Sequence, residues 1–284
     1  MTARGWIGAA ALAALAAAAV APAPVGATGL PSFTRAEALD LARVDVPAGV
    51  GLILHADFPA EAPLVVGDVA YHSVTIDLTP HGSVITRNAI AQGAETMPAG
   101  DECEDPTFKP MGVRWDAKAI PVGWRLDFSS IPDYLKTDRT RSAIRSAHRI
   151  WPRSQTTCSN RDENELRYSY LGHTARNPKY DRVNILDFGD LGAALAQNYT
   201  WYRDTEIVEV DLRLNKAFMW TNLAGVDRYH VRNVTAHELG HQVGLDDLGE
   251  PHRGLTMYAS IARGETTKTT LGFGDLKGAW AVSP

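Results

Sequence analysis

The chain has 284 residues, a formal net charge of −5 and 45% hydrophobic side chains. This composition supplies enough apolar surface for a folded core. The acidic balance excludes a broadly basic surface for nucleic acid or anionic membranes, so we expect neither nucleic acid nor a membrane among the partners of the mature chain.

Residues 1–27 have the pattern of a secretory signal peptide. Arg4 precedes an alanine-rich apolar run from Trp6 to Val20, and small residues end the segment at Val25-Gly26-Ala27. A membrane anchor is the alternative, but the run is short and alanine-rich for a bilayer span. We expect cleavage of this segment and a secreted, extracellular, soluble monomer.

Residues 28–100 are expected to form a β-rich prosegment or accessory region. The predicted strands are Val50–Leu54, which stops at His55, and then Val69–Leu78 and Ser83–Arg87 on either side of a Pro-His-Gly turn. The small, polar Ala91–Gly100 stretch is a predicted linker or processing site. Three histidines have no ligand spacing and are expected at the surface or in strands: His55, His72 and His81.

Residues 101–284 are expected to form one α/β domain. A strand is predicted at Gly123–Phe128, and a helix from about Thr137 to Trp151, capped by Thr137 or Asp138 and closed by Pro152. His148 on this helix has no partner at metal spacing, so a surface or packing role is expected. Later strands are predicted at Arg167–Leu171, Val183–Phe188, Leu195–Trp201 and Ile207–Leu214.

The chain has two cysteines, Cys103 and Cys158. In an exported protein an even cysteine count indicates a disulfide. We expect one intramolecular bond, which would tie residues near 103 to the segment after the first long helix.

The strongest signal in the sequence is His237-Glu238-Leu239-Gly240-His241. On a helix both imidazoles project from one face and reach the same ion, while Glu238 lies beside them as a base and not as a ligand. The alternative is a solvated helix whose histidines bind nothing. Apolar residues favour a buried helix, in which a metal would give the imidazoles a partner: Val231, Val234, Leu239, Val243 and Leu245.

A third ligand is expected from beyond this helix. Gly244 lies where a helix is readily ended by a residue with positive φ, and Asp247 follows as the chain doubles back. Two imidazoles, one carboxylate and an open fourth position describe a catalytic zinc site. Asp246 and His252 compete for the third position, and the signature spacing favours Asp247.

This motif resembles that of the metzincin zinc endopeptidases, His-Glu-x-x-His-x-x-Gly-x-x-His/Asp followed by a turn with Met. Leu255-Thr256-Met257-Tyr258 is similar to that Met-turn, and Asp247 to the third ligand of snapalysin-type members. The resemblance implies a twisted mixed sheet packed on the zinc-binding helix, over roughly the last 160 residues. Three other segments are similar to parts of matrixins: Gly192–Ala196, Ile207–Leu212 and Leu271–Gly278.

The resemblance also implies a mechanism. Zinc would acidify a water molecule and polarise the scissile carbonyl, with Glu238 as general base. Met257 would pack beneath the ligands, and Tyr258 is a candidate for stabilising the oxyanion, with packing as its alternative role. The edge strand around Ala194-Leu195-Ala196 would bind the peptide or protein substrate by strand addition.

The chain departs from matrixins in ways that bear on other sites. No structural zinc is predicted, because no histidine lies between His173 and His230. Many matrixins hold a propeptide cysteine on the zinc, but acidic neighbours oppose a Cys103 thiolate and favour the disulfide. Calcium binding is left open, and three carboxylates are expected to be solvated: Asp187, Asp190 and Asp211.

Three classes of function remain. The first is a secreted zinc endopeptidase with Glu238 as base. The second is a zinc hydrolase of the glutamate-ligand type, whose third ligand would be Glu265, although the surrounding residues lack the supporting motif. The third is a non-catalytic secreted zinc-binding protein on the same fold, which would have no need of Glu238.

Overall fold

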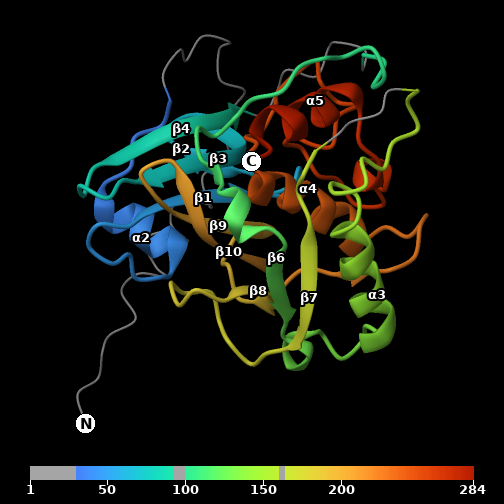
Figure 1. Cartoon of the computed structure of the whole chain (residues 1–284), viewed down its shortest axis with the longest axis horizontal. Helices are drawn as coiled ribbons and strands as arrows, with labels where there is room; N and C mark the ends of the chain where they lie inside the picture. Colours follow the sequence, from blue (N-terminus) through green and yellow to red (C-terminus); the bar gives the residue numbers. More distant parts are fainter. Residues whose placement is uncertain (1–29, 92–99, 160–163) are drawn as a thin grey trace.

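The computed structural model of the protein describes residues 30–91, 100–159 and 164–284. The expected signal peptide and most of the expected linker lie outside the described residues. Among the described helices, none has both the length and the apolar character needed to cross a membrane. Ten strands form one mixed sheet with helices against it, so the fold belongs to the α/β class (Figure 1).

Five strands of the C-terminal part lie side by side in the order β7-β6-β8-β10-β9. Neighbours among β7, β6, β8 and β10 are parallel, whereas β9 runs antiparallel to β10. The strands predicted in this part are confirmed to within a few residues: β6 (Val122–Leu126), β7 (Tyr168–His173), β8 (Asn184–Gly189), β9 (Ala196–Arg203) and β10 (Glu206–Asn215).

Residues 30–91, which we call the N-terminal extension, continue this sheet beyond β9. Strand β1 (Gly51–Asp57) pairs antiparallel with β9 on one side and with β3 (Val69–Leu78) on the other. Strands β2 (Leu64–Val66) and β4 (Val84–Ala91) both pair with β3, and the predicted turn between β3 and β4 is confirmed. In Figure 1 these blue and cyan strands lie beside the orange β9 and β10.

The prediction that the first strand stops at His55 is wrong, because ladder partners in β3 and β9 carry β1 on to Asp57. Side chains alternate between the faces of a strand. Three apolar residues of β1 pack in one core with α2 (Arg35–Ala42), whereas Ile53 belongs to the core that contains residues of α4 (Val231–Val243). His55 and Asp57 share the face of Ile53 and are therefore directed toward α4.

Helix α4 lies between α5 (Phe273–Val282) and α3 (Thr137–Ala147) (Figure 1). The helix α3 is shorter than predicted, and neither expected cap is correct, since Lys136 occupies the N-cap position without a side-chain hydrogen bond. The remaining elements are short: β5 (Arg114–Trp115), β11 (Trp220–Thr221), β12 (Tyr229–His230), and the 3₁₀ turns η1 (Ala117–Ala119), η2 (Phe128–Ser130) and η3 (Thr267–Thr269).

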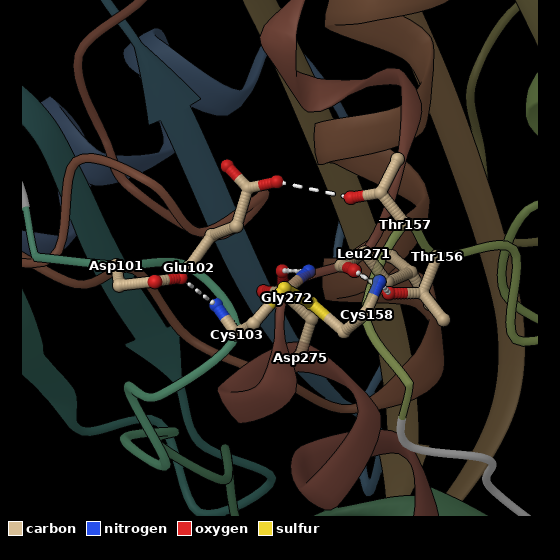
Figure 2. The surroundings of a disulfide bond; sticks show 9 residues. All are labelled: Asp101, Glu102, Cys103, Thr156, Thr157, Cys158, Leu271, Gly272 and Asp275. Atoms are coloured by element: carbon tan, nitrogen blue, oxygen red, sulfur yellow. Dashed lines mark hydrogen bonds between the residues drawn. A yellow bond between two sulfur atoms is a disulfide. The ribbon is translucent and has the colours of Figure 1, made fainter.

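Cys103 and Cys158 form a disulfide with their Cα atoms 5.2 Å apart, which confirms the expected bond. Figure 2 shows the disulfide beside Leu271 and Gly272, at the start of α5. The hydroxyl of Thr156 donates to the Leu271 carbonyl, and the Phe273 N–H donates to the Glu102 carbonyl. The bond therefore lies where three segments meet, and Cys103 is not available as a thiolate ligand.

Candidate metal centre

Helix α4 is buried on nearly all sides, because every one of its residues except Arg232 is shielded from solvent. The predicted apolar set on this helix is therefore confirmed as core. Two indole N–H groups hold its backbone carbonyls: Trp151 donates to Ala236 at 2.8 Å and Trp115 donates to Gln242 at 2.9 Å. These two hydrogen bonds from residues outside the helix fix its rotation about its own axis.

Gly244 ends α4 in the left-handed conformation that the sequence predicts, with φ of 116°. Its N–H donates to the carbonyls of Gly240 and His241. A Cβ at this position would lie 2.8 Å from the Val113 carbonyl oxygen, so the close approach of a neighbouring segment also requires glycine. The chain then turns back and brings Asp247 to the histidines.

Four buried side chains converge beside α4: Asp57, His237, His241 and Asp247. One potential ligand atom from each lies within 4.8 Å of the others. Nε2 of His237 is 3.2 Å from Asp247 Oδ1 and 3.3 Å from Asp57 Oδ2, and Nε2 of His241 is 3.6 Å from Asp247 Oδ1. The two predicted histidines and the favoured third residue are thus brought together, with Asp57 as a fourth.

The imidazoles are oriented by backbone carbonyls. Nδ1 of His237 lies 2.7 Å from the Thr256 carbonyl oxygen, and Nδ1 of His241 lies 2.8 Å from that of Leu245. With Nδ1–H donated to a carbonyl, the lone pair of each Nε2 faces the cluster, as in histidines that ligate metals.

Within the part of the chain that the structure describes, the ligand-type atoms of the cluster have no hydrogen-bond partners. This is true of Nε2 in both histidines and of both carboxylate oxygens in Asp57 and Asp247. Buried polar atoms without partners are costly and rare. A divalent cation would give all of these groups a partner and would balance the two carboxylates. Two imidazoles and two carboxylates are a donor set that suits Zn²⁺.

The charges of the cluster shift its pKa values in opposite directions. Burial alone would lower the pKa of His237, but the carboxylates of Asp57 and Asp247 outweigh it and raise that pKa to about 10. Burial lowers the pKa of His241 to about 4, and the neighbouring His55 adds to this effect. The two carboxylates therefore favour a positive charge at the place where they meet the imidazoles.

Glu238 is fully buried, and neither of its carboxylate oxygens has a hydrogen-bond partner among the described residues. It does not belong to the four-residue cluster. Burial raises the pKa of Glu238 well above its usual value, and the charges of Asp57 and Asp247 raise it further. A buried carboxyl group with a shifted pKa beside a set of ligand-type side chains is a candidate for proton transfer.

The competing third ligands lie elsewhere. Asp246 accepts a hydrogen bond from Thr75 at 2.7 Å, and His252 Nδ1 lies 2.7 Å from the carboxylate of Asp105. Glu265, the ligand of the glutamate-type alternative, accepts from groups of its own loop, Ala262 N–H and the Thr267 hydroxyl. Among the described residues, Asp247 alone of these candidates faces the histidines.

Asp57 is the site residue that the sequence analysis missed. The sequence around Asp57 did contain one indication of a special role. The stretch Gly51–Ala56 is apolar apart from His55, and an acidic residue follows it directly. A buried carboxylate requires a partner. Its proximity to α4, however, depends on the pairing of β1 with β9, which joins residues more than a hundred positions apart.

The structure bears on several other expectations, and it corrects the one for two aspartates. Asp187 and Asp211 are not solvated: Asp187 pairs with Arg213, and Asp211 accepts backbone N–H bonds from Lys179 and Ile185. Tyr258 donates its hydroxyl to Glu250 at 2.6 Å. His148 is buried and stacks on Trp124 with ring centroids 3.6 Å apart, which agrees with a packing role.

Comparison of the sequence with protein-family models finds no match, and comparison with curated proteins finds none either.

Proposed function

We propose that the chain is a secreted, zinc-dependent endopeptidase of the metzincin type. The observation that carries the proposal is the convergence of unpartnered Nε2 atoms of His237 and His241 with the carboxylate of Asp247, beside an unpartnered Glu238. Secretion is supported by the pattern of residues 1–27 and by the disulfide, which is typical of oxidising compartments.

In the proposed reaction His237, His241 and Asp247 hold the metal. When bound, Zn²⁺ supplies a Lewis acid that polarises a carbonyl and makes water a stronger acid. Glu238 accepts the proton of the attacking water on its carboxylate and passes it to the leaving amine. Asn198 holds the Glu238 carbonyl at 3.0 Å, which fixes the backbone of the base against β9. Met257 packs against Gly240, where a Cβ would lie 2.1 Å from its sulfur.

A non-catalytic metal-binding protein is the second candidate. It is favoured by Asp57, which gives the cluster four protein side chains, the number found in closed structural zinc sites. The unpartnered and buried Glu238 favours the enzyme, because a structural site has no use for a costly buried carboxyl group beside it.

Cleavage of an unbiased peptide library by zinc-loaded protein tests the function. The intact chain and its Asp57→Ala variant are assayed together, because Asp57 adds a fourth ligand-type side chain to the cluster. Glu238→Gln in each background is expected to keep zinc and to lower cleavage by roughly 100-fold or more. If neither background cleaves any peptide while both bind zinc, the endopeptidase proposal is wrong and the structural candidate stands.

A further inference from the structure

A pocket of about 540 Å³ lies between α3 and the strands β6 and β7. Trp124 of β6 and two tyrosines of β7, Tyr168 and Tyr170, line it together with the end of α3 and the turns that follow. Figure 1 shows α3 beside β7. None of the lining residues belongs to the cluster of four ligand-type side chains. The volume falls in the range of about 300–1,000 Å³ that small-molecule sites have.

Four exposed arginines line this pocket. Arg145, Arg149 and Arg153 follow one another at intervals of four residues, which places them on one side of a helix. The Arg153 N–H donates to the Arg149 carbonyl at 3.3 Å, so the helical spacing continues into the turns beyond α3. Arg167 comes from the segment just before β7. Guanidinium groups from two parts of the chain therefore meet at one pocket.

Two of these side chains are held by contacts that leave their charge unbalanced. The guanidinium carbon of Arg145 lies 5.1 Å from the centre of the Tyr170 ring, in a cation–π contact. Nη1 of Arg167 donates to the carbonyls of Asn164 at 3.0 Å and Leu166 at 2.6 Å. These contacts orient the guanidinium groups without supplying a negative charge.

Acidic side chains do not neutralise the pocket. No aspartate or glutamate lines it, and within the described residues none of its four guanidinium groups forms an ion pair with a carboxylate. The ion pair of α3 joins Arg141 to Asp138 at 2.9 Å, near the start of the helix. Burial lowers the pKa of Arg232 on α4, and the charge of Arg149 lowers it further. The pocket is therefore positively charged in a chain whose formal net charge is −5.

The sequence concentrates these charges in one segment. Residues 139–158 contain five arginines and no lysine, aspartate or glutamate. Like charges four residues apart on a helix repel each other and destabilise it. An anion bound between the guanidinium groups would relieve this repulsion.

The use of arginine indicates the kind of anion. The planar guanidinium group matches two oxygens of one phosphate or carboxylate, whereas the ammonium group of lysine acts as a point charge. A phosphomonoester carries a charge of about −1.5 to −2 at pH 7 and three acceptor oxygens. It can therefore engage several guanidinium groups at once, which a single carboxylate with two oxygens does less well. Four convergent arginines favour a phosphate over the side chains of an acidic peptide.

The size of the pocket and its aromatic walls indicate what carries the phosphate. The volume of about 540 Å³ exceeds what one phosphate ion needs, and Tyr168 and Tyr170 both contribute to the walls. Aromatic side chains offer flat apolar surface on which a ring can pack. A ring attached to the phosphate would occupy the space that the anion leaves.

We propose that the pocket between α3, β6 and β7 binds a small phosphomonoester that carries a ring. The guanidinium groups of Arg145, Arg149, Arg153 and Arg167 hold the phosphate, and the ring lies against the tyrosines of β7. The site is separate from the candidate metal centre, and the inference does not depend on the endopeptidase function.

Isothermal titration calorimetry at constant ionic strength tests the binding. Zinc-loaded protein is titrated with adenosine monophosphate, glucose 6-phosphate and phosphotyrosine, and also with adenosine, glucose, tyrosine, inorganic phosphate and tetraglutamate. At least one of the three esters is expected to bind roughly 10-fold or more tightly than its phosphate-free counterpart, than inorganic phosphate and than tetraglutamate.

The double variant Arg149→Gln/Arg153→Gln is expected to bind that ester roughly 100-fold or more weakly, because two charge-assisted contacts are lost. Arg139→Gln is the matched control, since Arg139 is an exposed arginine of α3 that does not line the pocket. Its affinity for the ester is expected to equal that of wild type. Zinc content and circular dichroism check that the double variant is folded.

Chemical labelling locates the ester on the wild-type protein. Phenylglyoxal modifies exposed guanidinium groups, and mass spectrometry of the digested protein reports the extent at each arginine. The bound ester is expected to protect Arg149 and Arg153 from modification and to leave Arg139 as reactive as before.

Several results would overturn the proposal. They are failure of all three esters to bind, equal binding by the double variant, and equal protection of Arg139 and Arg149. Loss of binding on zinc chelation with no effect of the arginine substitutions would place the anion at the metal. Tetraglutamate or inorganic phosphate bound as tightly as the best ester would replace the ligand class with an acidic peptide or a free ion. None of these measurements depends on peptide cleavage, so they stand apart from the test of the endopeptidase function.

Discussion

At the scale of single residues, the structure distinguishes three side chains that compete in the sequence for one ligand position. Asp247 faces the two histidines, whereas Asp246 is bonded to Thr75 and His252 to Asp105. Asp247→Ala is expected to lose bound zinc, because a buried ligand is removed. Asp246→Ala and His252→Ala are expected to retain zinc, with at most the roughly 10–100-fold weakening that loss of an outer-shell partner causes.

Metal content and affinity of the three purified variants, measured by mass spectrometry and chelator competition, check this prediction. A His252→Ala protein that loses its zinc while Asp247→Ala keeps it would show that the third ligand is assigned to the wrong residue.

His148 provides a test of pH dependence away from the metal. Burial lowers its pKa from 6.5 to about 3, and the bond to the Ile144 carbonyl opposes this only in part. The unfolded chain therefore binds a proton at higher pH than the folded one. The contribution of neutral His148 to stability is present above pH 6.5 and is lost progressively as the pH falls toward 3.

His148→Phe keeps an aromatic ring on Trp124 but cannot be protonated. Between pH 6.5 and 5 the wild-type free energy of unfolding is expected to fall by about 2 kcal/mol more than that of the variant. Urea unfolding at fixed free zinc measures the difference, with the exposed His81→Ala as control. Parallel pH profiles of wild type and His148→Phe would mean that His148 is charged in the fold.

The convergence of His237, His241 and Asp247 could be predicted from the sequence for a physical reason. Ligands on one helix are related by a fixed four-residue spacing, and Gly244 marks the end of that helix locally. Asp57 and the carbonyl partners of the imidazoles could not be predicted in this way. They reach the helix through tertiary contacts such as the 2.7 Å approach of the Thr256 carbonyl to His237, which no local pattern encodes.

At the scale of elements, α5 supports the turn at Leu255–Tyr258 through one buried carboxylate. Asp275 accepts N–H bonds from Thr256 at 2.7 Å and from Met257 at 3.1 Å. The carbonyl of Thr256 in turn orients His237. The position of the imidazole therefore depends on a helix that supplies no ligand.

Asp275→Asn is expected to lower zinc affinity by roughly 10–100-fold, because its amide group cannot accept all of these N–H bonds and the Thr256 carbonyl shifts. Trp280→Ala, at an exposed position of the same helix, is the matched control. Chelator competition measures both. An affinity unchanged in Asp275→Asn would show that the turn at Leu255–Tyr258 keeps its geometry without these hydrogen bonds.

Element types were predictable from the sequence where a local pattern is clear, as for the alternation of β3 and the four-residue spacing of the histidines in α4. The boundaries of the helices and strands were less predictable than their types. Strand β1 was expected to stop at His55, but it continues for two more residues to Asp57. It does so because β3 and β9 pair with it on both sides. Likewise, α3 ends at Ala147, and turns carry the chain on to Trp151. For β1, tertiary partners decide where the regular structure ends.

At the scale of the whole molecule, the sheet joins two regions that the sequence presents as separate. Strand β1 lies between β3 and β9 and thus has neighbours from both regions. Pairing between strands so far apart in the chain is set by long-range packing, for which composition gives no signal. The sequence therefore indicated strands in residues 28–100 without indicating that they continue the sheet of the C-terminal part.

The disulfide is the covalent constraint on this assembly. It joins residues 55 positions apart, and in the chain-entropy account a loop of that length restricts the unfolded state by about 4 kcal/mol. The double variant Cys103→Ser/Cys158→Ser is therefore expected to unfold at a midpoint roughly 8–16 °C lower. Scanning calorimetry of zinc-loaded wild type and variant, with reduced wild type as control, measures the shift.

Zinc affinity at 25 °C is expected to change little in this double variant, because the disulfide touches the start of α5 and none of the four ligand-type side chains. A large loss of zinc with an unchanged midpoint would reverse this assignment. It would mean that the disulfide maintains the geometry of the candidate metal centre and adds little to the stability of the fold. Residues 271 and 272 contact the disulfide segments, so this alternative has a structural basis.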